Sequence, residues 1–183
     1  MGMLSLIRRL EDLCNELGIR ADPVFVNSYL LCYLDGEIDL EFVVNKIKQL
    51  PTDSAKYIAD SLMYFLFSLN SRDATNFYSM LPEALRLILS PYFALILPDI
   101  ILGKARSFGI RRDFVISYCA VGYALLKNFE KAQVILRNIR RVDAKALALV
   151  GIATIAHFEG NEALSNRLIK IVEKLAKQER GYV

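Results

Sequence analysis

The stretch ALALVGIATIAHFEGNEALSNRL, Ala146–Leu168, shows most clearly how this chain of 183 residues folds. A helix over 146–158 is apolar nearly all round, so it needs cover on several sides, and its Ala and Gly residues let neighbouring helices come close. Gly160-Asn161 is a turn, and the segment 162–177 that follows is amphipathic, with Lys, Arg and Glu on one face. Because helices joined by so short a turn are antiparallel neighbours, the stretch predicts a helical hairpin with one buried helix.

The same alternation recurs earlier in the chain. Segments 57–69 and 114–126 are also apolar nearly all round, and their partners near 38–48 and 129–141 are amphipathic. In stacked helical hairpins, each inner helix lies between neighbouring units in this way. Apolar residues recur at three- and four-residue spacing almost everywhere, and no long alternating run indicates strands. We therefore expect an all-α fold of about ten helices, arranged as antiparallel hairpins in a short right-handed superhelix; a compact helical bundle is the alternative.

Glycine and proline positions predict the limits of these helices. Gly18 is a C-terminal cap for the first helix, and Asp22-Pro23 has the form of an N-cap followed by proline at the first helical position. Three prolines divide the middle of the chain into short pieces; Ser90-Pro91 is the strongest sign of a helix start, and Pro98 either starts or kinks a helix. We expect one domain over 1–183, most regular over 109–178 and broken by prolines over 82–108.

Two consecutive units in the C-terminal third share a pattern of small and aromatic residues. Their turns, Lys127-Asn128 and Gly160-Asn161, lie about 33 residues apart, close to the roughly 34-residue period of one repeat class. This pattern resembles tetratricopeptide-type hairpins, in which a tight turn is followed by an aromatic residue and an alanine where two helices touch. The resemblance implies packed helical hairpins with a concave protein-binding side, and it assigns helix contacts and turns to Ala120, Tyr123, Phe129, Ala132, Ala153 and Gly160.

The chain departs from that pattern at three places. Lys127 stands where the family has a glycine, and the second unit has no aromatic residue after its turn. The close-contact position of the second unit falls on Leu164 or Ser165. The proline-containing middle does not fit the pattern at all, so the bundle alternative stays open.

Composition and charge narrow the class of protein. The chain is 54% hydrophobic and carries 23 Lys and Arg against 20 Asp and Glu, a net charge of +3 that permits nucleic-acid binding without indicating it. Cys14, Cys32 and Cys119 are an odd, widely spaced set without a C-x-x-C pair, which predicts reduced thiols. The apolar stretches are shorter than the roughly 18–20 residues of a membrane span. We therefore expect a cytoplasmic protein.

Catalytic and ligand-binding signatures are missing from the sequence. His157 is the only histidine, which excludes two-histidine zinc motifs, and the glycines form no phosphate-binding loop. The acidic run DGEIDLE, 35–41, has Gly36 too early for a calcium loop, so we interpret it as a turn and an acidic helix start. We expect no catalytic residue, cofactor or metal; an enzyme would need an unrecognised polar site around His157 or a pair of carboxylates.

Five arginines are the candidate contacts for an anion or nucleic acid. Exposed cations of this kind contact phosphates, although cations are also favoured at helix C-termini for structural reasons. If the helix over 129–141 is regular, three of them share one ridge. The five are Arg111 and Arg112 before one helix, and Arg137, Arg140 and Arg141 at the end of the next.

One aromatic face is the candidate partner-binding surface. Tyr57, Ser61 and Tyr64 lie on a second, mixed face of a helix whose other face is already apolar. Such a face packs in a core, lines a groove for a partner helix or peptide, or associates with a second copy. The apolar excess further predicts at least a dimer. We expect a non-enzymatic interaction module or scaffold that binds another protein or itself; a helical protein that binds nucleic acid through its arginines is the alternative.

Overall fold

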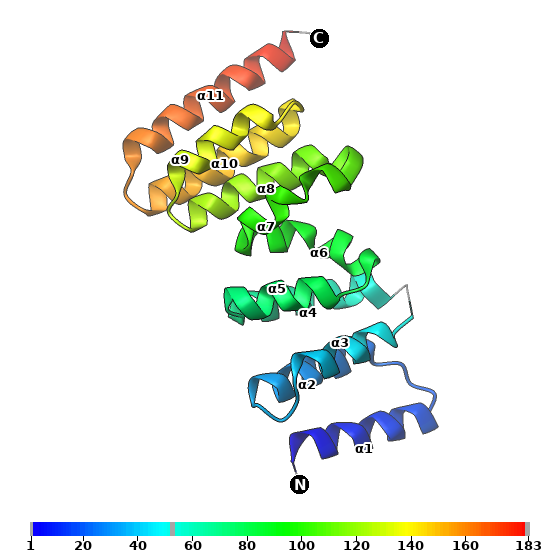
Figure 1. The fold of residues 1–183 in the computed structure, drawn as a ribbon. Coiled ribbons are helices and arrows are strands. Elements are labelled where there is room, and N and C mark those ends of the chain that lie inside the picture. The colour runs from blue at the N-terminus through cyan, green and yellow to red at the C-terminus, as the bar shows by residue number, and fades with distance from the viewer. Residues whose placement is uncertain (1, 52–53, 182–183) are drawn as a thin grey trace. The chain divides into compact units, whose positions relative to one another are not determined.

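The computed structural model describes residues 2–51 and 54–181, apart from the side chains of Pro23, Ala55–Tyr57, Asp60, Met63 and Tyr64. These residues form helices and the turns between them, and they include no strand, which confirms the all-α prediction (Figure 1). The number of α-helices, eleven over the described ranges, also agrees with the expected ten or so. The superhelical arrangement stays a prediction.

The helices group into two compact units, one ending at Leu89 and one starting at Ser90. The expectation of a single domain stays a prediction. The N-terminal unit contains α1 (Met3–Glu16), α2 (Asp22–Leu34), α3 (Leu40–Lys48), α4 (Ala55–Ser68) and α5 (Ser71–Met80), and α6 (Glu83–Ile96) crosses the division. The C-terminal unit continues with α7 (Pro98–Gly103), a 3-10 helix (Ala105–Arg111), α8 (Arg112–Leu125), α9 (Phe129–Ile135), a 3-10 turn (Leu136–Asn138), α10 (Val142–Phe158) and α11 (Glu162–Arg180).

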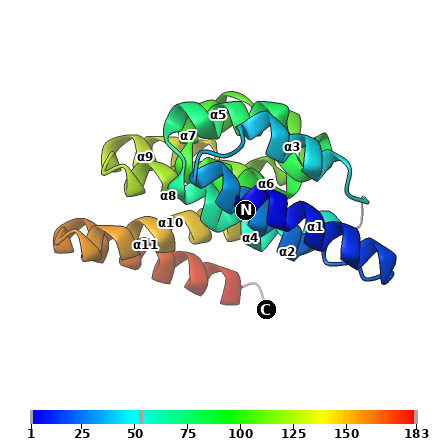
Figure 2. The ribbon, with the colours of Figure 1, turned by 90° about the horizontal axis from the view of Figure 1, so that it is seen from below.

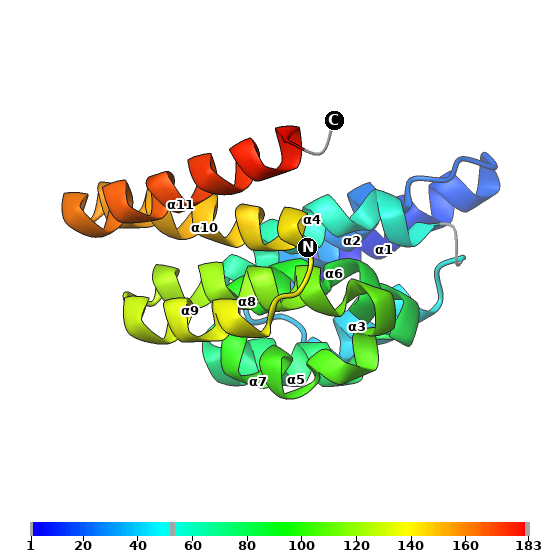
Figure 3. The same ribbon diagram turned by 90° about the horizontal axis from the view of Figure 1, so that it is seen from above.

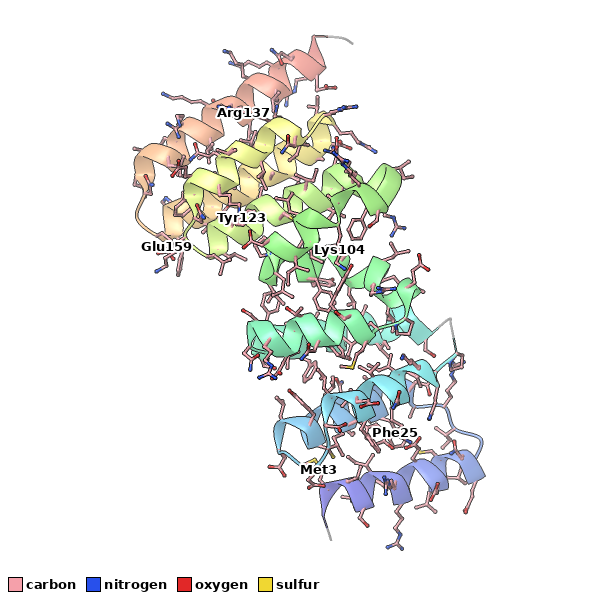
Figure 4. All side chains as sticks on the ribbon, viewed as in Figure 1. Met3, Phe25, Lys104, Tyr123, Arg137 and Glu159 are labelled. Carbon is pink, nitrogen blue, oxygen red and sulfur yellow. The ribbon has the colours of Figure 1, made fainter. Side chains whose placement is uncertain are left out.

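In the N-terminal unit, α2 packs against α1, α3 and α4 (Figures 1 and 2). α2 is apolar on most sides, so it needs cover from several neighbours, and these three helices bury its Tyr29 and Cys32 almost completely. Phe25, labelled in Figure 4, packs against the same cluster. Edge-to-face contacts extend the core to α4 and α5, with the ring centres of Phe65 and Phe77 5.4 Å apart.

In the C-terminal unit, α8 packs against α7, α9 and α10, and α10 packs in turn against α11 (Figure 3). Small residues let these helices approach, as the sequence predicts: Ala120 and Ala148 are fully buried. A Cβ atom added to Gly151 of α10 would lie 2.6 Å from Cγ2 of Val121 on α8. The two inner helices of the regular region are therefore direct neighbours.

Three expected helix limits are wrong. Asp22 is the first residue of α2 and makes no capping hydrogen bond, so it does not serve as its N-cap. Pro91 lies inside α6 instead of starting a helix. An internal proline costs a helix about 3 kcal/mol, and α6 offsets this by burying Leu89 and Phe93 on either side of it. The helix expected over 129–141 ends at Ile135 and continues only as the 3-10 turn to Asn138.

Candidate docking groove and the arginine cluster

The α10–α11 hairpin carries two adjoining hollows of about 650 and 520 Å³. Val172 and Ala176 line both, so the hollows form one elongated depression between the two helices. We name this depression the α10–α11 groove. Its apolar lining consists of Val142, Ala146, Val150, Ala153, Ile169, Val172, Leu175 and Ala176, with the methyl-bearing Thr154 among them.

Local sequence features hold the two walls of the groove together. Gly160 takes a left-handed conformation at the turn, with φ of 80°, as the sequence predicts. Asn161 then caps α11 by accepting a hydrogen bond from the Leu164 backbone N–H at 3.2 Å. Inside the hairpin, the buried Ser165 hydroxyl donates to the Ala153 carbonyl oxygen at 2.9 Å. This bond links the two helices at the floor of the groove.

The walls of the groove leave apolar surface in contact with water. Val150 on α10 is 52% exposed and Ile169 on α11 is 44% exposed. Contiguous apolar surface with a polar rim is typical of interaction sites. A groove that runs between two helices matches the shape of a third helix with an apolar face.

The rim of the groove is mainly acidic. Four carboxylates, those of Asp143, Glu162, Glu173 and Glu179, line it together with the single guanidinium of Arg141. Asp143 pairs with Arg141 at 2.9 Å, and Glu162 lies 2.8 Å from Nδ1 of the exposed His157. Glu173 and Glu179 make no hydrogen bond or ion pair within the described residues. The free carboxylates therefore favour a positively charged partner.

The arginine cluster is organised by a buried carboxylate that the sequence analysis did not single out. Asp113, in the first turn of α8, is only 8% exposed. Its Oδ2 accepts hydrogen bonds from the backbone N–H groups of Arg140 and Arg141, at 2.8 and 2.7 Å. Its Oδ1 accepts one from the Arg112 guanidinium at 3.0 Å. Burial opposes the charged form, but the two backbone donors and Arg112 together hold the pKa of Asp113 below its usual range.

These bonds correct the prediction of a helical arginine ridge. Arg137 lies in the 3-10 turn, and Arg140 and Arg141 lie between that turn and α10. The chain leaves the helix because Asp113 takes the N–H groups of Arg140 and Arg141, which a continuing helix would bond to its own carbonyls.

The five arginines differ in how far they are engaged within the protein. Arg112 also donates to the Asn138 carbonyl at 3.1 Å, and Arg141 lies 4.9 Å from the Phe114 ring centre. The side chains of Arg111, Arg137 and Arg140 are exposed and form no ion pair with an acid among the described residues. Figure 4 shows where Arg137 lies.

The structure describes only part of the predicted aromatic face. Ser61 is half-buried on α4, whereas the side chains of Tyr57 and Tyr64 lie outside the part of the chain that the structure describes. Their role as a partner-binding surface therefore stays a prediction.

The resemblance assigned six residues to helix contacts and turns, and that assignment stays a prediction. Ala120, Tyr123, Ala132 and Ala153 are buried, Phe129 is half-buried, and Gly160 forms the turn. Lys127, which stands where the tetratricopeptide pattern has glycine, has a φ of 63° and so takes the conformation that glycine would favour.

Tyr123, labelled in Figure 4, belongs to a small polar network at the α7–α8–α9 contact. Its hydroxyl donates to Asp99 Oδ1 at 2.5 Å, and Lys131 Nζ donates to the same oxygen at 2.7 Å. The hydrogen bonds from Lys131 and Tyr123 lower the pKa of Asp99. Burial and the bond to Asp99 raise the pKa of Tyr123 to about 12.

The acidic run 35–41 has a role that sequence reasoning found only in part. Asp39 caps α3 by accepting from the Phe42 N–H at 2.8 Å, as expected of an acidic helix start. Glu37 instead reaches the start of α1, where it accepts from the N–H groups of Met3 and Leu4 at 3.1 and 2.8 Å. No sequence signal joins residues so far apart.

The groove itself was also missed. Its signal was present in α11, where Ile169 and Val172 line the groove and Ile171 adds exposed apolar surface outside it, which is more than a helix with one covered face needs. Within the described residues, no group of three His, Cys, Asp or Glu side chains is placed to hold a metal ion.

None of the helices in the described ranges combines the length and apolar character needed to cross a bilayer. Comparison with protein-family models, with curated proteins and with solved structures finds no match. The α10–α11 groove and its acidic rim are therefore the features of the structure that bear on function.

Proposed function

We propose that the protein is a non-enzymatic interaction module whose α10–α11 groove binds an amphipathic helix of another protein. The observation that carries this proposal is the half-exposed apolar lining between two rigidly paired helices. Burying such surface against a partner stabilises a complex by roughly 25 cal/mol for each Å² of apolar area removed from water.

The architecture of the hairpin supports a helix as the occupant. α10 is apolar nearly all round, and α8 and α11 cover two of its sides. In stacked hairpins, the first helix of a following unit lies in the groove between the two helices before it. A partner helix in this place would complete the cover of Val150 and Ile169.

The rim chemistry defines the partner further. Glu173 and Glu179 on α11 would face the flanks of a bound helix. Lys or Arg residues beside the apolar face of that helix would pair with them, so we expect a basic amphipathic partner helix. The proposal requires no cofactor, and His157 serves in it as part of the rim.

The test is capture of partners from the native extract by the tagged full chain, with and without nuclease, followed by mass spectrometry. Val172→Glu places a carboxylate in the centre of the groove, and Lys174→Gln, on the exposed side of α11, changes the net charge equally and is the control. The proposal predicts a stoichiometric protein that survives nuclease, binds the control and is lost from Val172→Glu. Circular dichroism checks that both variants fold.

Two results would contradict the proposal. A partner that binds wild type and Val172→Glu equally uses another surface. Material that disappears with nuclease, and with Arg137→Glu and Arg140→Glu, would favour the nucleic-acid alternative, for which binding should also weaken steeply with salt.

A further inference from the structure

A stripe of leucines runs along the exposed side of α1. Leu6, Leu10, Leu13 and Leu17 are 47%, 45%, 44% and 72% exposed. They follow one another at intervals of four, three and four residues. This is the heptad spacing of a helix that packs along its length against another helix. We name these four residues the α1 leucine stripe.

The other side of α1 is already used within the N-terminal unit. Ile7 is buried against α2, and the Tyr29 hydroxyl donates to the Glu11 carboxylate. Lys46 on α3 pairs with the same carboxylate at 3.6 Å. The Arg8 guanidinium lies 5.7 Å from the centre of the Phe42 ring. These contacts set the rotation of α1, so the leucine stripe is held toward the outside of the unit.

Two opposite charges flank the stripe on the side away from these contacts. Arg9 and Glu16 are both exposed, seven residues apart, and neither makes a hydrogen bond or ion pair within the described residues. If Leu10 and Leu17 occupy a positions of a heptad, Arg9 and Glu16 directly before them occupy g positions. An antiparallel pair of α1 helices brings these positions of the two copies together. A parallel pair would place Arg9 beside Cys14 and would form no ion pair.

One antiparallel register satisfies every member of the stripe. With Leu10 opposite Leu13 of a second copy, Leu6 lies opposite Leu17, and all four leucines are covered. In the same register Arg9 of each copy faces Glu16 of the other, which gives two symmetry-related ion pairs. The hydrophobic and the charge patterns of α1 thus select the same arrangement.

We propose that α1 is a self-association surface, on which a second copy of the chain binds through an antiparallel α1–α1 pair to form a twofold symmetric dimer. The contact area of two four-turn helices is small compared with stable interfaces, so we expect a dimer that dissociates on dilution. This inference does not depend on the α10–α11 groove, which lies on other helices.

Sedimentation equilibrium of the full chain at low salt, over a concentration range of about a hundredfold around micromolar, measures this dimer. Arg9→Glu and Glu16→Arg each place like charges opposite each other at both ion-pair positions, so each should raise the dissociation constant by about tenfold or more. The double variant restores opposite charges in reverse order and should restore dimerisation. Asp12→Arg, at an exposed position outside the stripe, makes the same charge change as Glu16→Arg and should leave the dimer intact.

Cysteine cross-linking tests the register in a Cys14→Ser background. An oxidised mixture of Leu10→Cys and Leu13→Cys chains should form the mixed cross-linked dimer, whereas Leu10→Cys alone should cross-link poorly. Efficient cross-linking of Leu10→Cys to itself would indicate a parallel pair and overturn the proposal.

Other outcomes would also overturn it. A chain that stays monomeric throughout the range, or single variants that dimerise like wild type, would leave the stripe without this role. If the wild-type chain forms larger open-ended species with increasing concentration and Val172→Glu abolishes them, then α1 binds the α10–α11 groove of another copy and the proposal is wrong. A Val172→Glu chain that loses its captured partner but still dimerises would instead support the proposal, because it shows that the α1 surface acts independently of the groove.

Discussion

At the residue scale, Asp113 determines how two successive helical segments of the C-terminal unit are joined. Its carboxylate satisfies two consecutive backbone N–H groups, those of Arg140 and Arg141, at the approach to α10. These groups would otherwise be left without a partner where the chain departs from the helix. The arginines that the sequence offered as a phosphate-binding ridge therefore do not lie on one helix face. Among the five, only Arg111, Arg137 and Arg140 have exposed side chains that pair with no acid in the described residues.

Asp113→Asn tests this role. The Asp113 carboxylate uses one oxygen for the two backbone N–H groups and the other for Arg112. An amide has only one oxygen, so one of these two sites would instead hold an NH₂ group that faces another donor. We expect the free energy of unfolding to fall by about 1–3 kcal/mol, measured by urea denaturation at neutral pH. Asp143→Asn removes an exposed partner of Arg141 and should have a much smaller effect. Equal losses in the two variants would contradict the assignment.

The same carboxylate predicts how stability depends on pH. Because the folded pKa of Asp113 lies below its unfolded value, its contribution is present above the unfolded pKa and is lost as pH falls through the folded one. The difference between wild type and Asp113→Asn should therefore be largest near neutral pH and should shrink below about pH 4. Urea denaturation at a series of pH values checks this, and a difference that grows on acidification would exclude it.

At the scale of elements, the small residues of α8 set how closely its neighbours pack. A Cβ atom added to Gly122 would lie only 2.4 Å from the Ala94 carbonyl oxygen, an atom of the α6 backbone. A backbone atom cannot move aside as the end of a side chain can. The Ala and Gly residues of the inner helices predict close helix contacts from sequence. Composition alone does not identify Gly122 as the position where the contact is tightest.

Replacement of this glycine should separate the two helices. We expect Gly122→Ala to lower the free energy of unfolding by about 1–3 kcal/mol, because the extra methyl group forces the α6 and α8 backbones apart. Gly103→Ala is the matched control: no atom lies within 4 Å of its added Cβ, so it should be neutral or stabilise the fold by about 0.4–1 kcal/mol. Thermal or urea denaturation compares the two, and a destabilised Gly103→Ala with an unaffected Gly122→Ala would refute the argument.

At the scale of the whole molecule, the helices should differ in the stability of their backbone hydrogen bonds. α8 is covered by α7, α9 and α10, whereas the residues of α11 beyond Ile171 are mostly exposed. Local opening is easiest where few buried contacts are lost. We expect hydrogen exchange, followed by mass spectrometry, to be slowest in α8 and fast in the last two turns of α11. Equal protection of both would mean that another surface covers α11 in solution.

A large part of this fold is predictable from local sequence, because helix periodicity, caps and turns depend on neighbouring residues. The hairpin turns at Lys127-Asn128 and Gly160-Asn161 and the C-terminal cap at Gly18 are examples. Pro91 is the counterexample: local rules predict a helix start, and the buried residues on both sides of it keep the helix continuous.

The sequence by itself determined the helical class, the order of most helices and the small residues at their contacts, because these follow from the 3.6-residue period and from side-chain size. Only the tertiary structure decided which polar groups meet and which apolar residues stay exposed. Asp113 reaches Arg140 and Glu37 reaches Met3 across about thirty residues of chain. The α10–α11 groove and the α1 leucine stripe likewise depend on what each helix packs against: apolar spacing in the sequence marks the faces that need cover, and only the tertiary structure shows which of them stay uncovered.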